Sequence, residues 1–397
     1  QLNLNGSRLT SKQLDLLSVP LHLWLLAEIT RDPPIDALNF TTVKDLYDQF
    51  WKDKNNRVEE RLGKRVEWIK VIDQLCTYMS QKQSLSAPES IVDDYARDAE
   101  TMASENVLKW QNKRISFFHE EFFDYAFARR FAACGQKLLS FLQSEEQHLF
   151  RRAQVRQILL HEREADFDNY LMDLVALLYS SLIRFHLKQV VLSLLGNLSD
   201  PTPQEWKVLE PLIRNESSPI SHKIWQNLYG SASWFKLLDS LNVLVSCLDS
   251  EEDNKINKAI GYFLNVQEHC PERVAELLEP YVSSSQAWQQ RFVFFMQRSD
   301  LKAGRRFFDL FLHLLDDGTL DNARGPIAFN SDFWNLINPL HKEVPSWACE
   351  VIGHYLNRRL WLSLTQGQLN PFQTTIPNGQ LIEEIVLESA RKAPKKI

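Results

Sequence analysis

The stretch from Arg114 to Phe131 narrows the possible folds of this chain most, because its periodicity changes midway. In the first part, Ile115 and Phe117 alternate with polar residues, which predicts a short half-buried strand. From Glu120 onward, apolar residues recur every three or four positions, which predicts a helix. These residues cover most of the helix circumference, so we expect the helix to be buried inside a larger body.

A second short strand is predicted just upstream, at Val107–Trp110, with residues 111–113 as a hairpin loop. A hairpin that runs directly into a buried helix, with His119 at the junction, is typical of a winged-helix domain. We expect this hairpin, near Val107–Phe118, to be the only β structure in the chain. The sequence after residue 140 predicts helices alone.

Two motifs resemble a known family. Phe118-His119-Glu120, followed by Phe122, Phe123, Asp124, Tyr125, Ala128 and Arg129, resembles the Phe-x-His…Phe-x-(Glu/Asp)-Tyr-x-x-Ala motif. That motif belongs to the winged-helix domain of NACHT-type STAND NTPases, P-loop switches that include animal inflammasome receptors and bacterial antiviral ATPases. Ser18–Leu26 is similar to the Pro-Leu motif of that family's helical domain. The resemblance covers about residues 10–135.

The resemblance implies roles for two residues. His119 would contact the β-phosphate of ADP, and Pro20 would pack on the adenine ring, in both cases only together with an NTPase core that this segment lacks. The parent protein would bind ATP or ADP with Mg²⁺, and the segment alone would hold no cofactor. Considered without the resemblance, His119 is a junction histidine bonded to a backbone carbonyl. Likewise, Pro20 is a break between two apolar helices.

Before the hairpin, the pattern predicts five helices. Capping boxes at Thr10-x-x-Gln13 and Thr42-x-x-Asp45 mark the first and third, and Pro20 separates the first from the second. The continuation of the third helix, residues 52–65, is charged and therefore expected to be exposed. A fourth helix follows from Trp68, and Ser86-x-x-Glu89 predicts the cap of a fifth. We assign residues 1–60 to a helical segment that follows an NTPase core and residues 61–135 to a winged-helix domain.

Residues 136–397 predict one helix after another with short polar breaks. A capping box at Thr202-x-x-Glu205 starts one of them. Residues 208–213 echo residues 277–282, and prolines at 271, 345 and 394 each open an expected helix. The spacing is about that of two helix pairs, so we expect a HEAT- or TPR-like α-solenoid with a long loop at 316–330, truncated in mid-repeat.

The composition and charge of the chain make several classes of protein function unfavoured. The net charge of −6 and the pI near 6.0 make nucleic-acid binding an unfavoured function. Five cysteines without metal-ligand spacing indicate free, mostly buried thiols in a reducing cytoplasm. No apolar run is long enough to span a membrane. The basic run of Arg151, Arg152, Arg156, His161 and Arg163 is interpreted as the solvated face of a helix, pairing with its acidic neighbours.

The sequence contains no phosphate loop, so we expect no ATPase activity from this segment. The function implied by the resemblance is the regulatory and ligand-sensing region of a STAND/NACHT switch in antiphage defence. Its partners would be the NTPase core, a protein ligand on the helical repeats, and copies of the parent protein on activation. Two alternatives remain: a helical-repeat scaffold for protein–protein interaction without a nucleotide switch, and a DNA-binding regulator. The acidic, Phe-rich helix disfavours the second.

Overall fold

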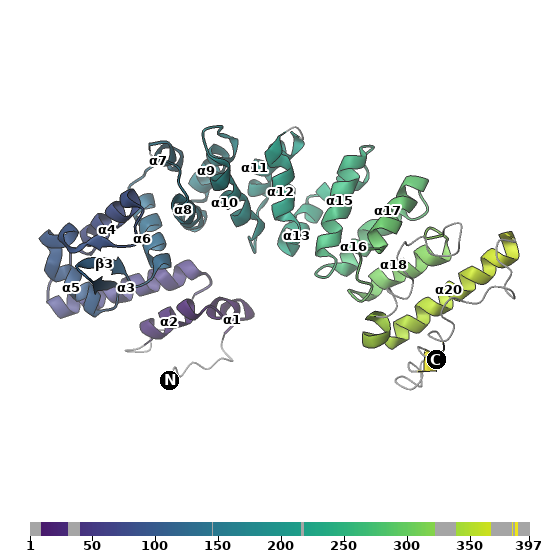
Figure 1. Ribbon diagram of the computed structural model, residues 1–397, viewed down its shortest axis with the longest axis horizontal. Coiled ribbons are helices and arrows are strands. Elements are labelled where there is room, and N and C mark those ends of the chain that lie inside the picture. Colours follow the sequence, from purple (N-terminus) through teal and green to yellow (C-terminus); the bar gives the residue numbers. More distant parts are fainter. Residues whose placement is uncertain are drawn as a thin grey trace. The chain divides into compact units, whose positions relative to one another are not determined.

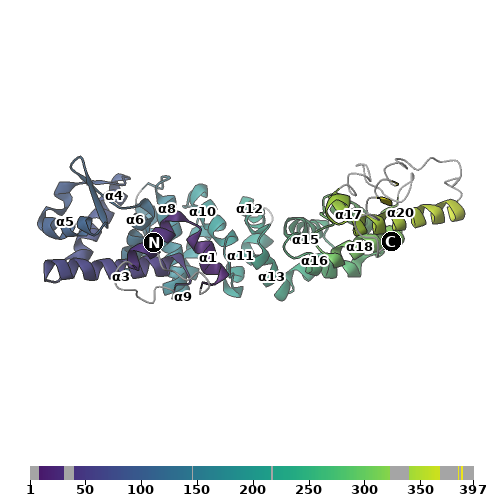
Figure 2. The ribbon, with the colours of Figure 1, turned by 90° about the horizontal axis from the view of Figure 1, so that it is seen from below.

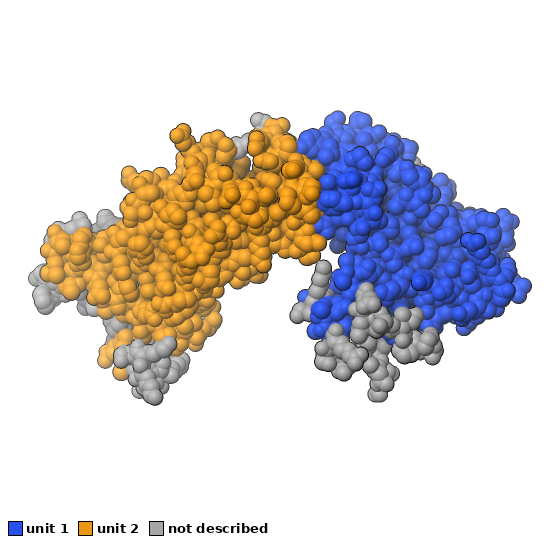
Figure 3. All heavy atoms as spheres, turned by 180° about the vertical axis from the view of Figure 1, so that it is seen from behind, with its two compact units in different colours: residues 1–194 blue, residues 195–397 orange. Residues whose placement is uncertain are grey.

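The computed structural model describes residues 9–30, 40–144, 146–215, 218–321 and 339–366, together with residues 383, 386 and 387. Within these ranges the chain is mainly helical, which confirms the mainly α part of the predicted fold class. The contacts within the chain divide it into two compact units, residues 1–194 (unit 1) and residues 195–397 (unit 2), which Figure 3 shows in different colours. The predicted domain boundaries at residues 60 and 135 both lie within unit 1.

Unit 1 begins with α1 (Ser11–Leu17), α2 (Pro20–Ile29) and α3 (Val43–Leu62). Thr10 and Thr42 form the two predicted capping boxes, each accepting a backbone N–H from the residue three positions on. Pro20 occupies the first turn of α2, where a missing N–H costs no intrahelical hydrogen bond. Helix α3 packs along α2, α5 and α6 (Figures 1 and 2).

A small antiparallel sheet follows α4 (Trp68–Lys82), in the strand order β1-β3-β2. The strands are β1 (Ala87–Pro88), β2 (Leu108–Gln111) and β3 (Arg114–Phe117), and between β1 and β2 lie the 3₁₀-helix η2 (Glu89–Tyr95) and α5 (Ala96–Ser104). The predicted hairpin is confirmed: Asn112 and Lys113, both at positive φ, form its two-residue turn.

Two expectations about this region are wrong. The hairpin is not the only β structure, because Ala87 and Pro88 pair with the free edge of β3. A strand of two residues is too short to show a pattern of alternating polar and apolar side chains, so the sequence could not predict β1. Pro88 is tolerated there because β1 is an edge strand. Nor does a helix start at Ser86: its side-chain and backbone oxygens accept hydrogen bonds from Arg114, and the helical turns begin at Glu89.

Helix α6 (Glu120–Ala133) is the buried helix that the sequence predicts. It packs against α3, α4 and α8, and its apolar residues are almost fully buried: Phe122, Phe123, Tyr125, Ala126, Phe127, Ala128 and Phe131. The ring of Phe122 contacts the ring of Phe50 on α3 and the rings of Phe117 and Phe118 at the end of β3. The core of unit 1 therefore lies around the start of this helix.

The remaining helices follow one another along the chain (Figure 1). In unit 1 these are α7 (Leu138–Ser144), α8 (Arg151–Ala165) and α9 (Phe167–Tyr179), and α10 (Phe185–Gly196) contains the unit boundary. Unit 2 contains α11 (Pro203–Arg214), α12 (Pro219–Leu228), α13 (Ala232–Ser240), α14 (Val243–Leu248), α15 (Asp253–Val266), α16 (Pro271–Leu278), η3 (Glu279–Tyr281), α17 (Gln286–Met296), α18 (Arg305–Asp316) and α20 (Pro345–Gln366).

Within unit 2, helices pack on near neighbours in sequence: α11 on α12, α14 on α15, α16 on α18, and α18 on α20. The predicted capping box of Thr202 and Glu205 starts α11, and Pro271 and Pro345 open α16 and α20. Pro394 and most of the expected loop at 316–330 lie outside the described residues. The echo between residues 208–213 and 277–282 falls on different kinds of element, since Pro211 lies inside α11 and Pro280 lies in η3, directly after α16.

The charged stretch 52–65 is only partly exposed, contrary to expectation. Most of it belongs to α3, and Lys54 and Val58 on that helix are fully buried against the rest of unit 1. The expectation of mostly buried thiols is also wrong, because only Cys76 is buried and Cys134 is exposed; all five are free. Among the described residues, no helix is long and apolar enough to cross a membrane.

Candidate functional site

A cavity of about 450 Å³ lies beside the start of α6 in unit 1. Its wall comes from segments far apart in the sequence: Leu21, Trp24 and Glu28 on α2, Asn106 and Lys109 before and on β2, and Phe118 and His119 at the β3–α6 junction. The two stretches that carry the family resemblance therefore line one cavity. A volume of this size suits a small ligand.

His119 is the N-cap of α6, with an extended backbone. Its Nδ1 atom accepts a hydrogen bond from the backbone N–H of Glu121 at 3.2 Å. Because Nδ1 is an acceptor in this contact, the proton of a neutral imidazole must reside on Nε2. The bond places the ring at the cavity wall and leaves its second nitrogen as a donor for a ligand.

Lys109 is the cation of this cavity. Its Nζ atom donates to the backbone carbonyl of Phe118 at 2.7 Å, directly before His119. Among the described residues no carboxylate pairs with it. The hairpin register explains the approach, because Lys109 lies opposite Ser116 and its long side chain reaches the end of β3.

The one acidic residue in the wall is neutralised. The Nζ atom of Lys54 lies 2.7 Å from Oε2 of Glu28, and the side chains are 1% and 2% exposed. A second carboxylate, on Glu105, lies 3.9 Å from the same nitrogen and is bound by Arg61 at 2.6 Å. The cavity wall is therefore rich in hydrogen-bond donors, and the positive charge of Lys109 is not cancelled by Glu28.

Trp24 forms the flat, aromatic part of the wall. Its ring centroid lies 4.8 Å from that of Phe118 and 5.8 Å from that of Phe50. Pro20, one helical turn earlier on α2, is exposed and is not part of the cavity wall. The adenine contact expected of Pro20 stays a prediction.

Negative charge collects in the first turn of α6, outside the cavity wall. Burial, with Glu120 and Glu121 nearby, raises the pKa of Asp124 to about 7. Glu121 accepts a hydrogen bond from the hydroxyl of Tyr47 at 3.2 Å, which ties α6 to α3. These carboxylates oppose the attraction that the helix N-terminus exerts on an anion.

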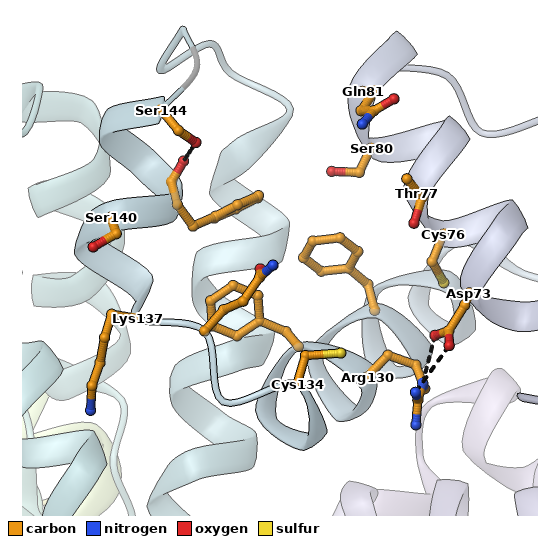
Figure 4. A pocket seen from close by; sticks show the side chains of 14 residues that line it. Asp73, Cys76, Thr77, Ser80, Gln81, Arg130, Cys134, Lys137, Ser140 and Ser144 are labelled. Atoms are coloured by element: carbon orange, nitrogen blue, oxygen red, sulfur yellow. Dashed lines mark hydrogen bonds and ion pairs between the residues drawn. The ribbon is translucent and has the colours of Figure 1, made fainter.

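A larger cavity, of about 650 Å³, lies between α4, the end of α6 and α7 (Figure 4). Phe127, Phe131 and Phe141 form an aromatic part of its wall, and hydroxyl and amide side chains of α4 and α7 face it. Arg130 and Asp73 close one end through a two-pronged ion pair, at 2.6 and 3.0 Å. Both charged groups are thus already satisfied within the protein.

The basic run of α8 is only partly a solvated face, because Arg152 and Arg156 are exposed whereas Arg151 is buried. Arg151 is 1% exposed, donates to Ser80 Oγ at 2.6 Å and lies over the ring of Phe141. Its neighbour Glu162 is buried as well and accepts from Asn169 at 2.9 Å instead of pairing with an arginine of α8. Sequence reasoning missed the burial of Arg151 because its partners Ser80 and Phe141 lie on α4 and α7, and spacing along α8 does not record them.

Lys109 and Trp24 are the site residues that sequence reasoning did not identify. For Trp24 a signal existed, since it follows Pro20 by four positions and so lies on the same face of α2. For Lys109 the signal was weak, because it depends on the register between two strands of only four residues each. Within the described ranges, no cluster of His, Cys, Asp or Glu is arranged to hold a metal ion.

Comparisons of the chain with protein-family models, with curated proteins and with solved structures gave no match.

Proposed function

We propose that this chain is the regulatory and ligand-sensing region of a STAND/NACHT-type NTPase switch. The observation that carries the proposal is the shared cavity. Leu21 and Trp24 of the Pro-Leu motif and Phe118 and His119 of the second motif lie almost a hundred residues apart, yet they line the same wall. Donors outnumber free acceptors there, which favours an anionic ligand such as the diphosphate of ADP.

The fold supports the same assignment. We interpret α4, α5, α6 and the three-stranded sheet as a winged-helix domain, with β2 and β3 as its wing. We interpret the helices that follow α6 as a HEAT- or TPR-like solenoid, because each packs mainly on near neighbours in sequence. Such an array can present a long surface to a protein ligand.

In the proposed mechanism, the NTPase core of the parent protein holds ADP against His119, and this contact keeps the switch closed. Recognition of a protein trigger by the helical repeats weakens the closed state. ATP with Mg²⁺ then replaces ADP, and the parent protein assembles into an oligomer that activates an effector, in the setting of antiphage defence. The chain itself contributes positioning and sensing, whereas the NTPase core contributes the phosphate loop.

The test is His119→Ala in the full-length natural protein, with ADP retention and melting temperature measured together. Loss of a hydrogen bond to a charged phosphate weakens ADP binding by about ten- to a hundredfold, or roughly 1.5–3 kcal/mol. Weaker ADP binding should also raise the activity of the switch in the absence of its protein trigger. The exposed His269, replaced by Ala, is the matched control. Unchanged ADP retention with a lowered melting temperature would show that His119 only caps α6 and does not bind ADP.

A wild-type protein that binds neither ADP nor ATP would leave the alternative, a helical-repeat scaffold that joins protein partners without a nucleotide switch. The coding sequence upstream of Gln1 gives an independent check. A phosphate loop there supports the switch, and its absence supports the scaffold.

A further inference from the structure

We propose that Lys109 is a second phosphate-binding residue beside His119, and that Trp24, not Pro20, is the surface on which the flat part of the ligand stacks. The inference rests on the proposed function and names two residues that the family resemblance does not. It defines the ligand class from the cavity itself: a molecule with a charged phosphate end and a planar ring, of nucleotide size.

The charge balance around His119 requires a cation from a side chain. The positive end of α6 normally attracts an anion, but Glu120 and Glu121 in its first turn counteract this attraction. A neutral imidazole donates one hydrogen bond and brings no charge. Glu28, which is also part of the cavity wall, is already neutralised by Lys54. Lys109 is thus the wall residue with a positive charge to offer.

The position of Lys109 suits that role. Its ammonium group is held by one contact, the carbonyl of Phe118, so two of its three N–H donors are left for other acceptors. Phe118 directly precedes His119 in the chain, so the ammonium group lies beside the cap of α6. The contact is to a neutral carbonyl, which a phosphate oxygen can replace or supplement as a stronger acceptor.

Trp24 provides an aromatic surface for the planar part of the ligand, which the phosphate contacts do not bind. It lies on α2, and its half-buried ring contacts the rings of Phe118 and Phe50. Packing on two rings holds the indole in place, so stacking a ligand on it costs little side-chain entropy. A fixed aromatic face binds a planar base through stacking and tolerates different bases. Exposed Pro20 has no comparable support from the cavity wall.

The experiment measures binding of ADP and of inorganic pyrophosphate to the full-length natural protein. We expect Lys109→Met to weaken both ligands by a similar factor of about ten or more, because both carry the phosphates. Lys109→Arg should retain most of the affinity. Trp24→Leu should weaken ADP about fivefold or more and leave pyrophosphate unchanged, and Trp24→Phe should restore ADP binding.

Lys113→Met is the matched control, because it removes a charge from the same hairpin at an exposed position outside the cavity wall. Should Lys109→Met behave like Lys113→Met while His119→Ala still loses ADP, Lys109 makes no phosphate contact and the proposed function stands. Equal loss of ADP and pyrophosphate in Trp24→Leu would show damage to packing and overturn the stacking role. A wild-type protein that binds neither probe overturns the proposed function itself.

Discussion

The ammonium group of Lys54 lies 2.7 Å from the carboxylate of Glu28, and both side chains are almost completely removed from solvent. The pair joins α3 to α2 across the core of unit 1. Glu28 is also part of the cavity wall, one helical turn beyond Trp24. The ion pair therefore holds in place the helix that supplies one side of the candidate site.

Breaking this pair should be costly. Lys54→Met leaves a buried carboxylate without its nearest cation, a change worth about 3–5 kcal/mol in comparable buried pairs. We expect the free energy of unfolding, measured by urea denaturation, to fall by that order. The exposed neighbour Lys52, replaced by Met, should change it by less than about 0.5 kcal/mol. Equal effects of the two substitutions would contradict the assigned role of Lys54.

Stability should fall as pH rises toward 8, because of Glu162. Burial, and then the charge of Asp173 on the facing helix, raises its pKa to about 8, from an ordinary value near 4.5. Between these values the folded protein binds more protons than the unfolded chain, so the free energy of unfolding decreases with pH. The slope from one group is at most about 1.4 kcal/mol per pH unit.

Glu162→Gln should reduce that slope and leave the part below about pH 7 that comes from Asp124, whose raised pKa of about 7 acts in the same direction. The exposed Glu60→Gln should leave the whole slope intact. Thermal unfolding between pH 6.5 and 8 measures the difference. This window avoids His161, whose pKa burial lowers to about 4 and which makes the protein less stable as pH falls from about 6.5. An equally steep loss of stability in Glu162→Gln would contradict the assignment.

Replacing two helical glycines by alanine should change the free energy of unfolding in opposite directions. A methyl group on Gly196, at the end of α10, would collide with the backbone oxygen of Asn227 on α12. Gly353, within α20, has open space around the corresponding position. We expect Gly196→Ala to lower the free energy of unfolding by about 1–3 kcal/mol, since main-chain atoms cannot easily move away. Gly353→Ala should raise it by up to about 1 kcal/mol through helix propensity. Chemical denaturation of the two variants side by side checks both.

Local features were predictable because short segments determine them. Thr10, Thr42 and Thr202 cap their helices as the capping boxes predict, since a cap involves only residues within one turn. The turn at Asn112 and Lys113 likewise depends on two residues. The period of α6 indicated burial correctly, because a helix apolar on most sides has no solvated face to offer.

Features that depend on distant neighbours were not predictable. From the sequence, Lys54 and Arg151 were expected to face solvent, but both are buried. Lys54 pairs with Glu28 on α2, and Arg151 contacts Ser80 and Phe141 on other helices. Strand β1 exists only because β3 offers it a free edge.

By itself, then, the sequence determined most of the helices, the caps at Thr10, Thr42 and Thr202, the hairpin and the two motifs, all of which arise from interactions within a few residues. Only the tertiary structure decided that the two motifs line one cavity and that Trp24 and Lys109 are part of its wall. It also decided which charges are neutralised there. The physical reason is that burial and electrostatic pairing depend on which surfaces pack together, and spacing along the chain does not record that.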